Sequence, residues 1–252
     1  AGLVLMEDLG TETIVDDAGK AIVERYEAAV DLLARMHGRD WPETLHFDGG
    51  TYPVPPYDID ALLVEISLYA DWYVPHSSGQ PLSPADHEAF LGDWRDTLSA
   101  ITGERPTWVM RDFHSPNILW QGEASGLERV GVIDIQDTLI GHTAYDVASL
   151  AQDARVEISE DLEAALYRRY CNARMVDDPQ FDTADFARAY AILGAQRATK
   201  VLGAFTRLSF HDGKPGYEFY LDRVKTVLAR NLRHPVLSGL RVWYSGLSGQ
   251  SV

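Results

Sequence analysis

Apolar residues near the start of the chain recur at spacings of three and four, the period of an amphipathic helix. The first such stretch spans residues 22–36 and ends at Gly38, a residue that commonly closes helices. Asp16 or Asp17 is the expected N-cap. Residues 2–10 form a short apolar run that ends in acidic residues and a glycine, which predicts a buried strand followed by a tight turn.

Two further helical stretches follow this one. Residues 59–73 repeat the same spacing, and Pro75 is expected to stop the helix. Residues 41–60 contain four prolines and two glycines, so they are expected to form an irregular connection. Ser83 is the expected cap of the third helix, supported by Glu88. Its inner face should carry Phe90, Leu91, Trp94 and Leu98.

The middle of the chain changes period and predicts short strands. Residues 107–110, 118–120 and 130–135 are β-like, and a glycine-containing turn joins the last two into a hairpin. The polar sequence R-D-F-H-S-P-N forms the loop that precedes this hairpin. Helical periodicity then returns in residues 145–151, 162–174, 186–205 and 217–231. The pattern indicates an α+β fold, mainly helical around a small β-hairpin.

Charge and cysteine content narrow the range of partners. The chain has 22 basic and 38 acidic residues, a formal net charge of −16, which argues against nucleic acid because phosphate binding needs a positive surface. The same charge is compatible with a cationic substrate or with a solvated acidic surface. Cys171 is the only cysteine and is expected to be buried and inert, which fits a cytoplasmic protein. No apolar run is long enough to suggest a membrane span.

Three polar residues flank the two strands of the predicted hairpin. Asp112 and Asn117 precede its first strand, and Asp134 follows the apolar V-G-V-I of its second. Magnesium prefers oxygen ligands, usually one or two carboxylates completed by phosphate oxygens and water. Asn117 and Asp134 are therefore candidate metal ligands, and Asp112 is a candidate acceptor for the proton of an attacking hydroxyl.

The segments R-D-F-H-S-P-N-I-L-W and V-I-D-I-Q-D-T-L-I-G-H-T-A-Y-D-V-A-S-L resemble the catalytic and metal-binding segments of the aminoglycoside phosphotransferase and choline kinase superfamily. The resemblance implies a protein-kinase-like C-terminal lobe that uses ATP and Mg²⁺. It assigns Asp112 as the catalytic aspartate and Asn117 and Asp134 as metal ligands. L-V-L-M-E-D-L-G resembles the family's hinge, so residues 1–10 are expected to be the hinge and residues 11–252 the lobe. Backbone groups of Glu7, Asp8 and Leu9 should then meet the adenine.

One branch of this superfamily is similar over more of the chain. R-D-F-H-S-P-N, S-L-A-Q-D-A-R and Q-R-A-T-K-V-L-G-A-F-T-R-L resemble bacterial kinases that phosphorylate the anomeric hydroxyl of N-acetylmuramate and N-acetylglucosamine in cell-wall sugar recycling. The resemblance implies a small amino-sugar substrate. An aminoglycoside or choline-type kinase is the alternative within the superfamily. A non-catalytic nucleotide-binding scaffold is the alternative from another class.

Two departures from the family pattern affect this interpretation. Met110 and Arg111 stand where aminoglycoside kinases usually have His and Gly, which weakens the hypothesis of an aminoglycoside kinase. A kinase also needs a glycine-rich phosphate cover and a strand lysine paired with a glutamate, and the chain contains neither. The resemblance therefore implies an N-terminal lobe of the same protein, with a pseudokinase as the alternative.

Further residues are candidates for supporting the site. His114 is expected to hold the catalytic loop in shape, and Asp146 to bond backbone amides of that loop by analogy with the family. Asp137 is expected either to assist a second metal or to form a simple turn. Lys200 and Arg197 are expected on the solvated surface.

Five candidates concern the sugar, each with a surface or core contact as the alternative. Arg155 offers a cation for a carboxylate such as the lactyl group of N-acetylmuramate. An aromatic ring such as Trp72 can pack on a sugar face. The full set is Glu65, Trp72, Tyr73, Asp153 and Arg155.

Overall fold

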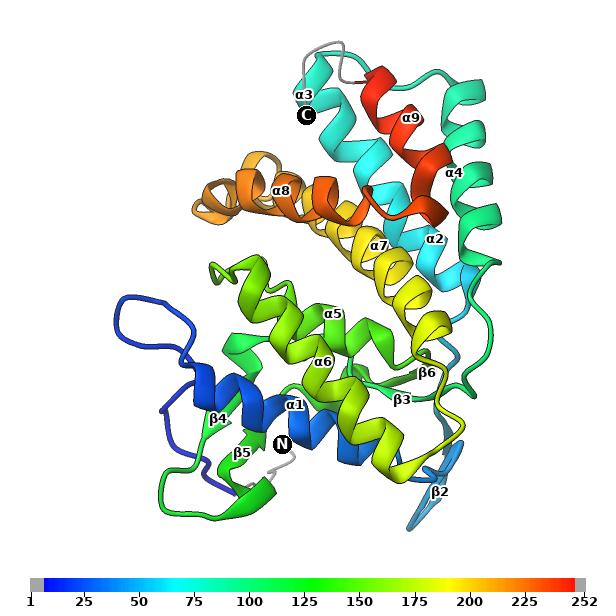
Figure 1. Ribbon diagram of the computed structural model, residues 1–252. Helices are drawn as coiled ribbons and strands as arrows, with labels where there is room; N and C mark the ends of the chain where they lie inside the picture. Colours follow the sequence, from blue (N-terminus) through cyan, green and yellow to red (C-terminus); the bar gives the residue numbers. More distant parts are fainter. Residues whose placement is uncertain (1–6, 248–252) are drawn as a thin grey trace.

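The computed structural model describes residues 7–247, which form one continuous hydrophobic core. In the lower half of Figure 1, α1 and α6 run next to each other and cover α5. The upper half is built from the remaining long helices, with α7 as the element that reaches both halves. The helices of the lower half are α1 (Val23–His37), α5 (Ala144–Ala151) and α6 (Glu160–Asp177).

The upper helices pack around α7, which is buried along most of its length. Alanines and glycines dominate its middle, so neighbouring helices can approach it closely. The helices of this half are α2 (Ile59–Leu68), a π-helical turn (Tyr69–Tyr73), α3 (Val74–Ser78), α4 (Pro84–Leu98), α7 (Thr183–Phe210), α8 (Leu221–Asn231) and α9 (Ser238–Leu247).

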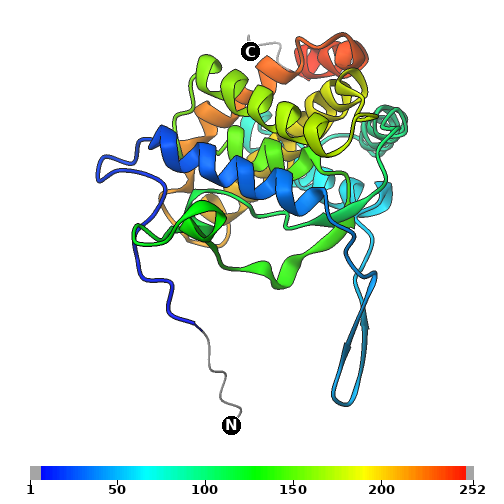
Figure 2. The same ribbon diagram turned by 60° about the horizontal axis from the view of Figure 1, so that its bottom comes forward.

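Three two-stranded antiparallel sheets complete the described residues. The hairpin of β4 and β5 pairs Ile118 with Val132, and β3 pairs with β6 through Trp108 and Ile140. The hairpin of β1 and β2 projects away from the body of the molecule (Figure 2). The strands are β1 (Thr44–Phe47), β2 (Gly50–Pro53), β3 (Thr107–Val109), β4 (Ile118–Trp120), β5 (Val130–Val132) and β6 (Leu139–Gly141).

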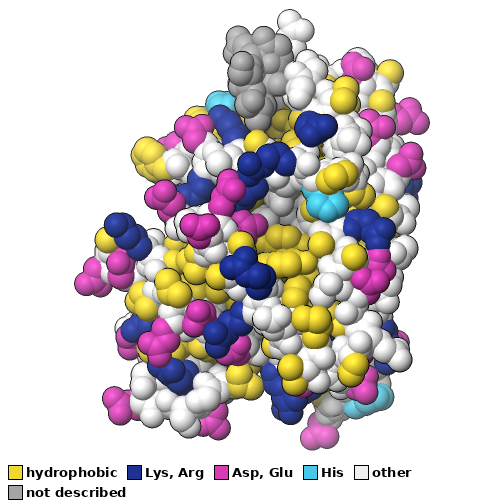
Figure 3. Space-filling model, viewed as in Figure 1, with side chains coloured by type: hydrophobic (Ala, Val, Ile, Leu, Met, Phe, Trp, Pro, Cys, Tyr) yellow, Lys and Arg dark blue, Asp and Glu magenta, His cyan; other side chains and the backbone are white. Residues whose placement is uncertain are grey.

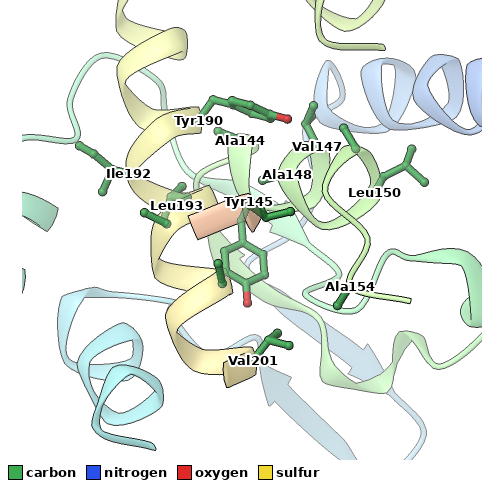
Figure 4. Packing of buried hydrophobic residues seen from close by; sticks show 14 of the residues in the cluster. Ala144, Tyr145, Val147, Ala148, Leu150, Ala154, Tyr190, Ile192, Leu193 and Val201 are labelled. Carbon is green, nitrogen blue, oxygen red and sulfur yellow. The ribbon is translucent and has the colours of Figure 1, made fainter. Parts of the chain in front are cut away.

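The contact between α5 and α7 places the functional segments on a rigid base. Figure 4 shows Tyr145 of α5 extending alongside α7 among buried alanine, valine and leucine side chains. Tyr145 is 1% exposed, and its ring lies edge-on to Tyr57 at a centroid distance of 4.9 Å. Because α5 follows directly after β6, this packing also fixes the loops at the ends of the short strands.

Gly203 marks the closest approach of α7 to α2. A Cβ atom at Gly203 would lie 2.2 Å from the backbone carbon of Leu68, which cannot move without shifting the helix. We expect Gly203→Ala to lower the free energy of unfolding by about 1–3 kcal/mol through overpacking. Gly92 lies on the exposed face of α4 with open space around it, so Gly92→Ala should stabilise by about 0.5–1 kcal/mol. Urea unfolding of both variants tests the pair, and equal effects would contradict this packing.

Several local predictions are confirmed. The helices around residues 22–36 and 186–205 form, as do the strands at 107–109 and the hairpin of β4 and β5. The side chain of Ser83 caps α4 by accepting a hydrogen bond from the amide of Asp86 at 3.1 Å. Cys171 is buried, and burial raises the pKa of its thiol.

Other local predictions are wrong. Ile22, not an aspartate, occupies the N-cap of α1, while Asp16 accepts hydrogen bonds within its own turn. Pro75 does not stop the second helix, because it lies in the first turn of α3, where no intrahelical N–H bond is lost. The helix ends at Gly79, which has a left-handed φ of 76°. Residues 41–60 are not wholly irregular as predicted, because they contain the β1–β2 hairpin.

Asp86, rather than Glu88, supports the cap of α4 through its contact with Ser83. The predicted strand of residues 2–10 lies mostly outside the described residues; residues 7–10 contain no strand, and Gly10 turns with a φ of 70°. The sequence pattern also did not predict β6 and α9.

Acidic and basic side chains are interspersed over the face shown in Figure 3. None of the helices in residues 7–247 is both long and apolar enough to cross a bilayer.

Candidate active site

Two polar loops meet at the open end of the β4–β5 hairpin. A 3₁₀ turn, Ser115–Asn117, leads into β4, and Asp134 follows β5. The amide of Ile133 donates to the carbonyl of Asn117 at 3.0 Å, which extends the hairpin by one bond. The side-chain Nδ2 of Asn117 donates to the backbone carbonyl of Asp112 at 3.0 Å and lies 3.5 Å from Oδ2 of Asp134. The structure thus brings Asp112, Asn117 and Asp134 together.

The backbone is strained on both sides of this cluster. Arg111 and Asp134 are the non-glycine residues with positive φ in the described chain, at 64° and 61°. Non-glycine residues in this conformation cost about 1–3 kcal/mol and persist where the surrounding contacts enforce them. The strain at Arg111 turns the chain immediately before Asp112.

Asp146 provides the contact that enforces this turn. It lies in the first turn of α5, is fully buried, and accepts the amides of Met110 at 2.7 Å and Arg111 at 3.0 Å. His37 lies behind it, with Nε2 at 3.5 Å from Oδ2 of Asp146. Both oxygens of Asp146 are therefore committed to the loop that carries Asp112.

Asp153 holds the other end of the same loop. Its Oδ2 accepts the backbone amide of Ser115 at 2.9 Å and the hydroxyl of Ser115 at 2.6 Å, and its Oδ1 accepts the amide of Arg155 at 2.8 Å. Asp153 is 1% exposed. Both of its oxygens are thus buried and engaged by the protein, which is the core contact that stood as the alternative to a sugar contact.

The side chain of His114, a residue of this loop, lies between Asp112 and Arg155. Its Nε2 is 3.9 Å from Oδ1 of Asp112 and 3.5 Å from Nη1 of Arg155. Burial, together with the charges of Arg197 and Arg155, lowers the pKa of His114 to about 4. Its imidazole is therefore neutral at pH 7, and the cation in contact with it is Arg155.

Glu65 anchors a second group of polar residues. Its carboxylate contacts Nη2 of Arg111 at 2.7 Å and Nζ of Lys200 at 2.9 Å, and it accepts the hydroxyl of Tyr57 at 2.5 Å. Burial alone would raise the pKa of Glu65, but Lys200, Tyr57 and Arg111 together lower it. Glu65 is 9% exposed. Its contacts with protein groups are the core contact that stood as the alternative to a sugar contact.

Lys200 and Arg197 are not on the solvated surface, contrary to the prediction. Arg197 is 6% exposed, and the side chain of Lys200 is 17% exposed. The residues around them, G-A-Q-R-A-T-K-V-L-G-A, are small or apolar on every side of the helix. That run is typical of a buried helix and is the signal that could have placed both cations inside.

The remaining candidates lie at two places. Trp72 and Tyr73 belong to the π-helical turn; Trp72 lies edge-on to His211 at 4.6 Å, and Tyr73 stacks on Tyr69 at 4.8 Å. The partner of Trp72 thus lies at the end of α7, and the partner of Tyr73 lies in the same π-helical turn. Asp137 is exposed at the end of the 3₁₀ turn Ile135–Asp137.

The expected hinge lies against the β4–β5 hairpin. The carbonyl of Leu9 accepts Nε2 of Gln121 at 2.5 Å, and the amide of Trp120 donates to the carbonyl of Glu12 at 2.7 Å. The side chain of Leu9 packs over Gly131, where a Cβ atom would lie only 3.0 Å from Leu9 Cδ1. Glu7 and Asp8 are exposed. The start of the described chain and the two candidate metal ligands are thus attached to one hairpin.

The donor set at the hairpin fits a hard divalent cation such as magnesium. Asn117 and Asp134 offer an amide oxygen and a carboxylate, which are hard oxygen ligands. Among the described residues, no three His, Cys, Asp or Glu side chains group closely enough to hold a metal by themselves. The pair suits a cation that takes its other ligands from phosphate and water.

Comparison with known proteins agrees with this geometry. The model of the Phosphotransferase enzyme family matches residues 1–190. The chain belongs to this family. The fold is similar to that of a solved structure, a choline/ethanolamine kinase family protein from Mesorhizobium loti, with a TM-score of 0.54 at 16% identity over 91% of this chain and 75% of that chain. The α+β, protein-kinase-like fold predicted from the sequence is confirmed.

Two curated relatives in the family carry the same name, N-acetylmuramate/N-acetylglucosamine kinase. The one from Caulobacter vibrioides is 32% identical over 246 residues, which cover 97% of this chain and 66% of the relative. The one from Pseudomonas aeruginosa is 34% identical over 226 residues, covering 86% of this chain and 61% of the relative. The chain therefore spans just under two thirds of the length of these relatives.

Proposed function

We propose that the protein carrying this chain is an ATP- and Mg²⁺-dependent kinase of the anomeric hydroxyl of N-acetylmuramate and N-acetylglucosamine. Asp112 orients the acceptor hydroxyl and accepts its proton. Asn117 and Asp134 hold magnesium, which supplies charge neutralisation for the phosphates when bound. Backbone groups of residues 7–9 meet the adenine, beside the hairpin that carries both ligands.

The proposal extends to the rest of the protein. We place residues 1–10 as the hinge and residues 11–252 as the catalytic and substrate-binding lobe. An N-terminal lobe of the same protein would supply the glycine-rich loop and the strand lysine. A cytoplasmic location would give it ATP.

The contact that carries the choice of substrate is the one between His114 and Arg155. Although the whole chain has a net charge of −16, Arg155 is a half-buried cation that contacts His114 at 3.5 Å, next to Asp112 in the catalytic loop. The nearby carboxylates Glu65 and Asp153 are engaged by protein groups. The guanidinium of Arg155 favours an acceptor with a carboxylate, such as the lactyl group of N-acetylmuramate, and disfavours a polycationic aminoglycoside.

An aminoglycoside or choline-type kinase remains the second candidate within the family. Its substrates are cations and need free carboxylates beside Asp112. The candidate from another class, a nucleotide-binding scaffold without catalysis, predicts binding of ATP but no turnover. The second kinase candidate thus differs from the leading proposal in its acceptors, and the scaffold differs in having no turnover.

ADP release by the whole protein with magnesium and ATP tests the proposal. The acceptors are N-acetylmuramate, N-acetylglucosamine, kanamycin and choline. We expect turnover with the two acetylated sugars. Turnover only with kanamycin or choline would keep the kinase and replace the substrate. Nucleotide binding without turnover on any acceptor would favour the scaffold.

Arg155→Met tests whether Arg155 binds the carboxylate of N-acetylmuramate or another part of the sugar. A charge-assisted hydrogen bond is worth about 1.5–3 kcal/mol, so we expect kcat/KM for N-acetylmuramate to fall about 10- to 100-fold. N-acetylglucosamine has no lactyl group, and its kcat/KM should change by less than about threefold. Arg168→Met, which removes an exposed arginine from α6, is the matched control. An equal loss for both sugars would contradict a contact with the carboxylate.

A further inference from the structure

Glu65 connects three parts of the molecule that are distant in sequence. It lies on α2, and its Oε1 contacts both Arg111 of the catalytic loop at 2.7 Å and Lys200 of α7 at 2.9 Å. Its Oε2 accepts the hydroxyl of Tyr57 at 2.5 Å and Nε2 of Gln196 at 3.2 Å. The carboxylate is thus fixed by four partners on one side of Asp112.

The two cations held by Glu65 come from the catalytic loop and from α7. Arg111 directly precedes Asp112 in the chain. Burial alone would lower the pKa of Lys200, but Tyr145, Glu65 and Asp112 together raise it. Lys200 therefore lies within the field of both carboxylates. Its ion pair with Glu65, and a weaker hydrogen bond at 3.4 Å to the hydroxyl of Tyr145, hold its ammonium group in place.

A buried cation without its partner carboxylate pairs with the next one available, because an unpaired buried charge is costly. Without the charge of Glu65, Lys200 and Arg111 would be drawn to the carboxylate of Asp112. An ion pair there would occupy the oxygen that must receive the proton of the acceptor hydroxyl. It would also make the carboxylate a weaker base.

We propose that Glu65 is a positioning residue for phosphoryl transfer, which holds Lys200 and the side chain of Arg111 away from Asp112. The inference rests on the proposed kinase activity. In that reaction the acceptor oxygen forms a bond to the γ-phosphorus while the bond from this phosphorus to the β,γ-bridging oxygen of ATP breaks. The acceptor proton passes to Asp112, and ADP leaves. Glu65 touches none of the reacting atoms and acts through the two cations.

Charge compensation in the whole protein tests the inference. We expect Glu65→Gln, which keeps the shape and removes the charge, to lower kcat about tenfold or more, while KM for ATP changes less than about twofold. Lys200→Met alone leaves the pair of Glu65 and Arg111, and kcat should stay within about threefold of wild type. The double variant removes the freed ammonium together with Glu65. It should therefore turn over faster than Glu65→Gln alone, which a merely structural role of Glu65 does not predict.

Glu163→Gln is a matched control for the loss of a buried carboxylate. Glu163 is 8% exposed and is held by Gln152, Tyr190 and Arg230. We expect a lower thermal midpoint, with kcat of the folded protein within about twofold of wild type and no rescue by Lys200→Met. The inference, but not the proposed function, would be overturned if the double variant were as slow as Glu65→Gln. The same would follow if Glu65→Gln kept the wild-type kcat. A wild type that transfers phosphate to no acceptor would remove the proposed function and this inference with it.

Discussion

Asp112→Asn is expected to lower kcat of the whole protein about 1000-fold, within the range of 10² to 10⁴ typical of a general base. The amide cannot accept the proton of the acceptor hydroxyl, yet it has nearly the same size. The backbone carbonyl of Asp112, which accepts the side chain of Asn117, is untouched by the change. Folding and nucleotide binding should therefore persist.

Steady-state ADP release and a separate titration of nucleotide binding check this expectation. Asp93→Asn, on the exposed face of α4, is the matched control and should keep wild-type kcat. A kcat for Asp112→Asn within tenfold of wild type would exclude Asp112 as the base. Loss of nucleotide binding together with activity would instead assign Asp112 a structural role in the loop.

Asp146→Ala is expected to lower the free energy of unfolding by about 3–5 kcal/mol, the cost of removing one partner from a buried charged network. The change leaves the amides of Met110 and Arg111 buried without an acceptor, and it removes the carboxylate beside His37. The strained φ of Arg111 then lacks its main support. Activity should fall as well, because that turn positions Asp112.

Urea unfolding of the whole protein measures this loss, and kcat is determined where the variant is still folded. Asp161→Ala removes an exposed carboxylate from the first turn of α6 and should cost less than about 1 kcal/mol. A loss below 1 kcal/mol for Asp146→Ala would show that the turn before Asp112 is held by other contacts.

Local patterns were enough to predict the elements nearest the chemistry. The β-like runs at residues 107–110, 118–120 and 130–135 predicted β3 and the β4–β5 hairpin. The hairpin depends on nearby residues because a short turn joins its two strands. The order D-x-x-x-x-N, strand, turn, strand and Asp placed three polar residues at one end of that hairpin. The structure brings these three together as the spacing indicated.

The sequence left alternatives open where a residue's partner lies far away in the chain. Glu65 and Asp153 were candidates for either a sugar contact or a core contact, and the structure gives them the protein partners Arg111, Lys200 and Ser115, on other elements. β6 was missed because three residues carry too little pattern, and its pairing with β3 supplies the stability.

The sequence by itself determined the family, the helical body and the identity of the three residues at the hairpin. Each of these depends on spacing within a short stretch of chain. Only the tertiary structure decided that Lys200 and Arg197 lie inside the fold, that Asp146 holds the turn before Asp112, and that His114 lies between Asp112 and Arg155. The physical reason is that burial and charge pairing are properties of groups brought together by packing, and α7 meets the catalytic loop only in the folded chain.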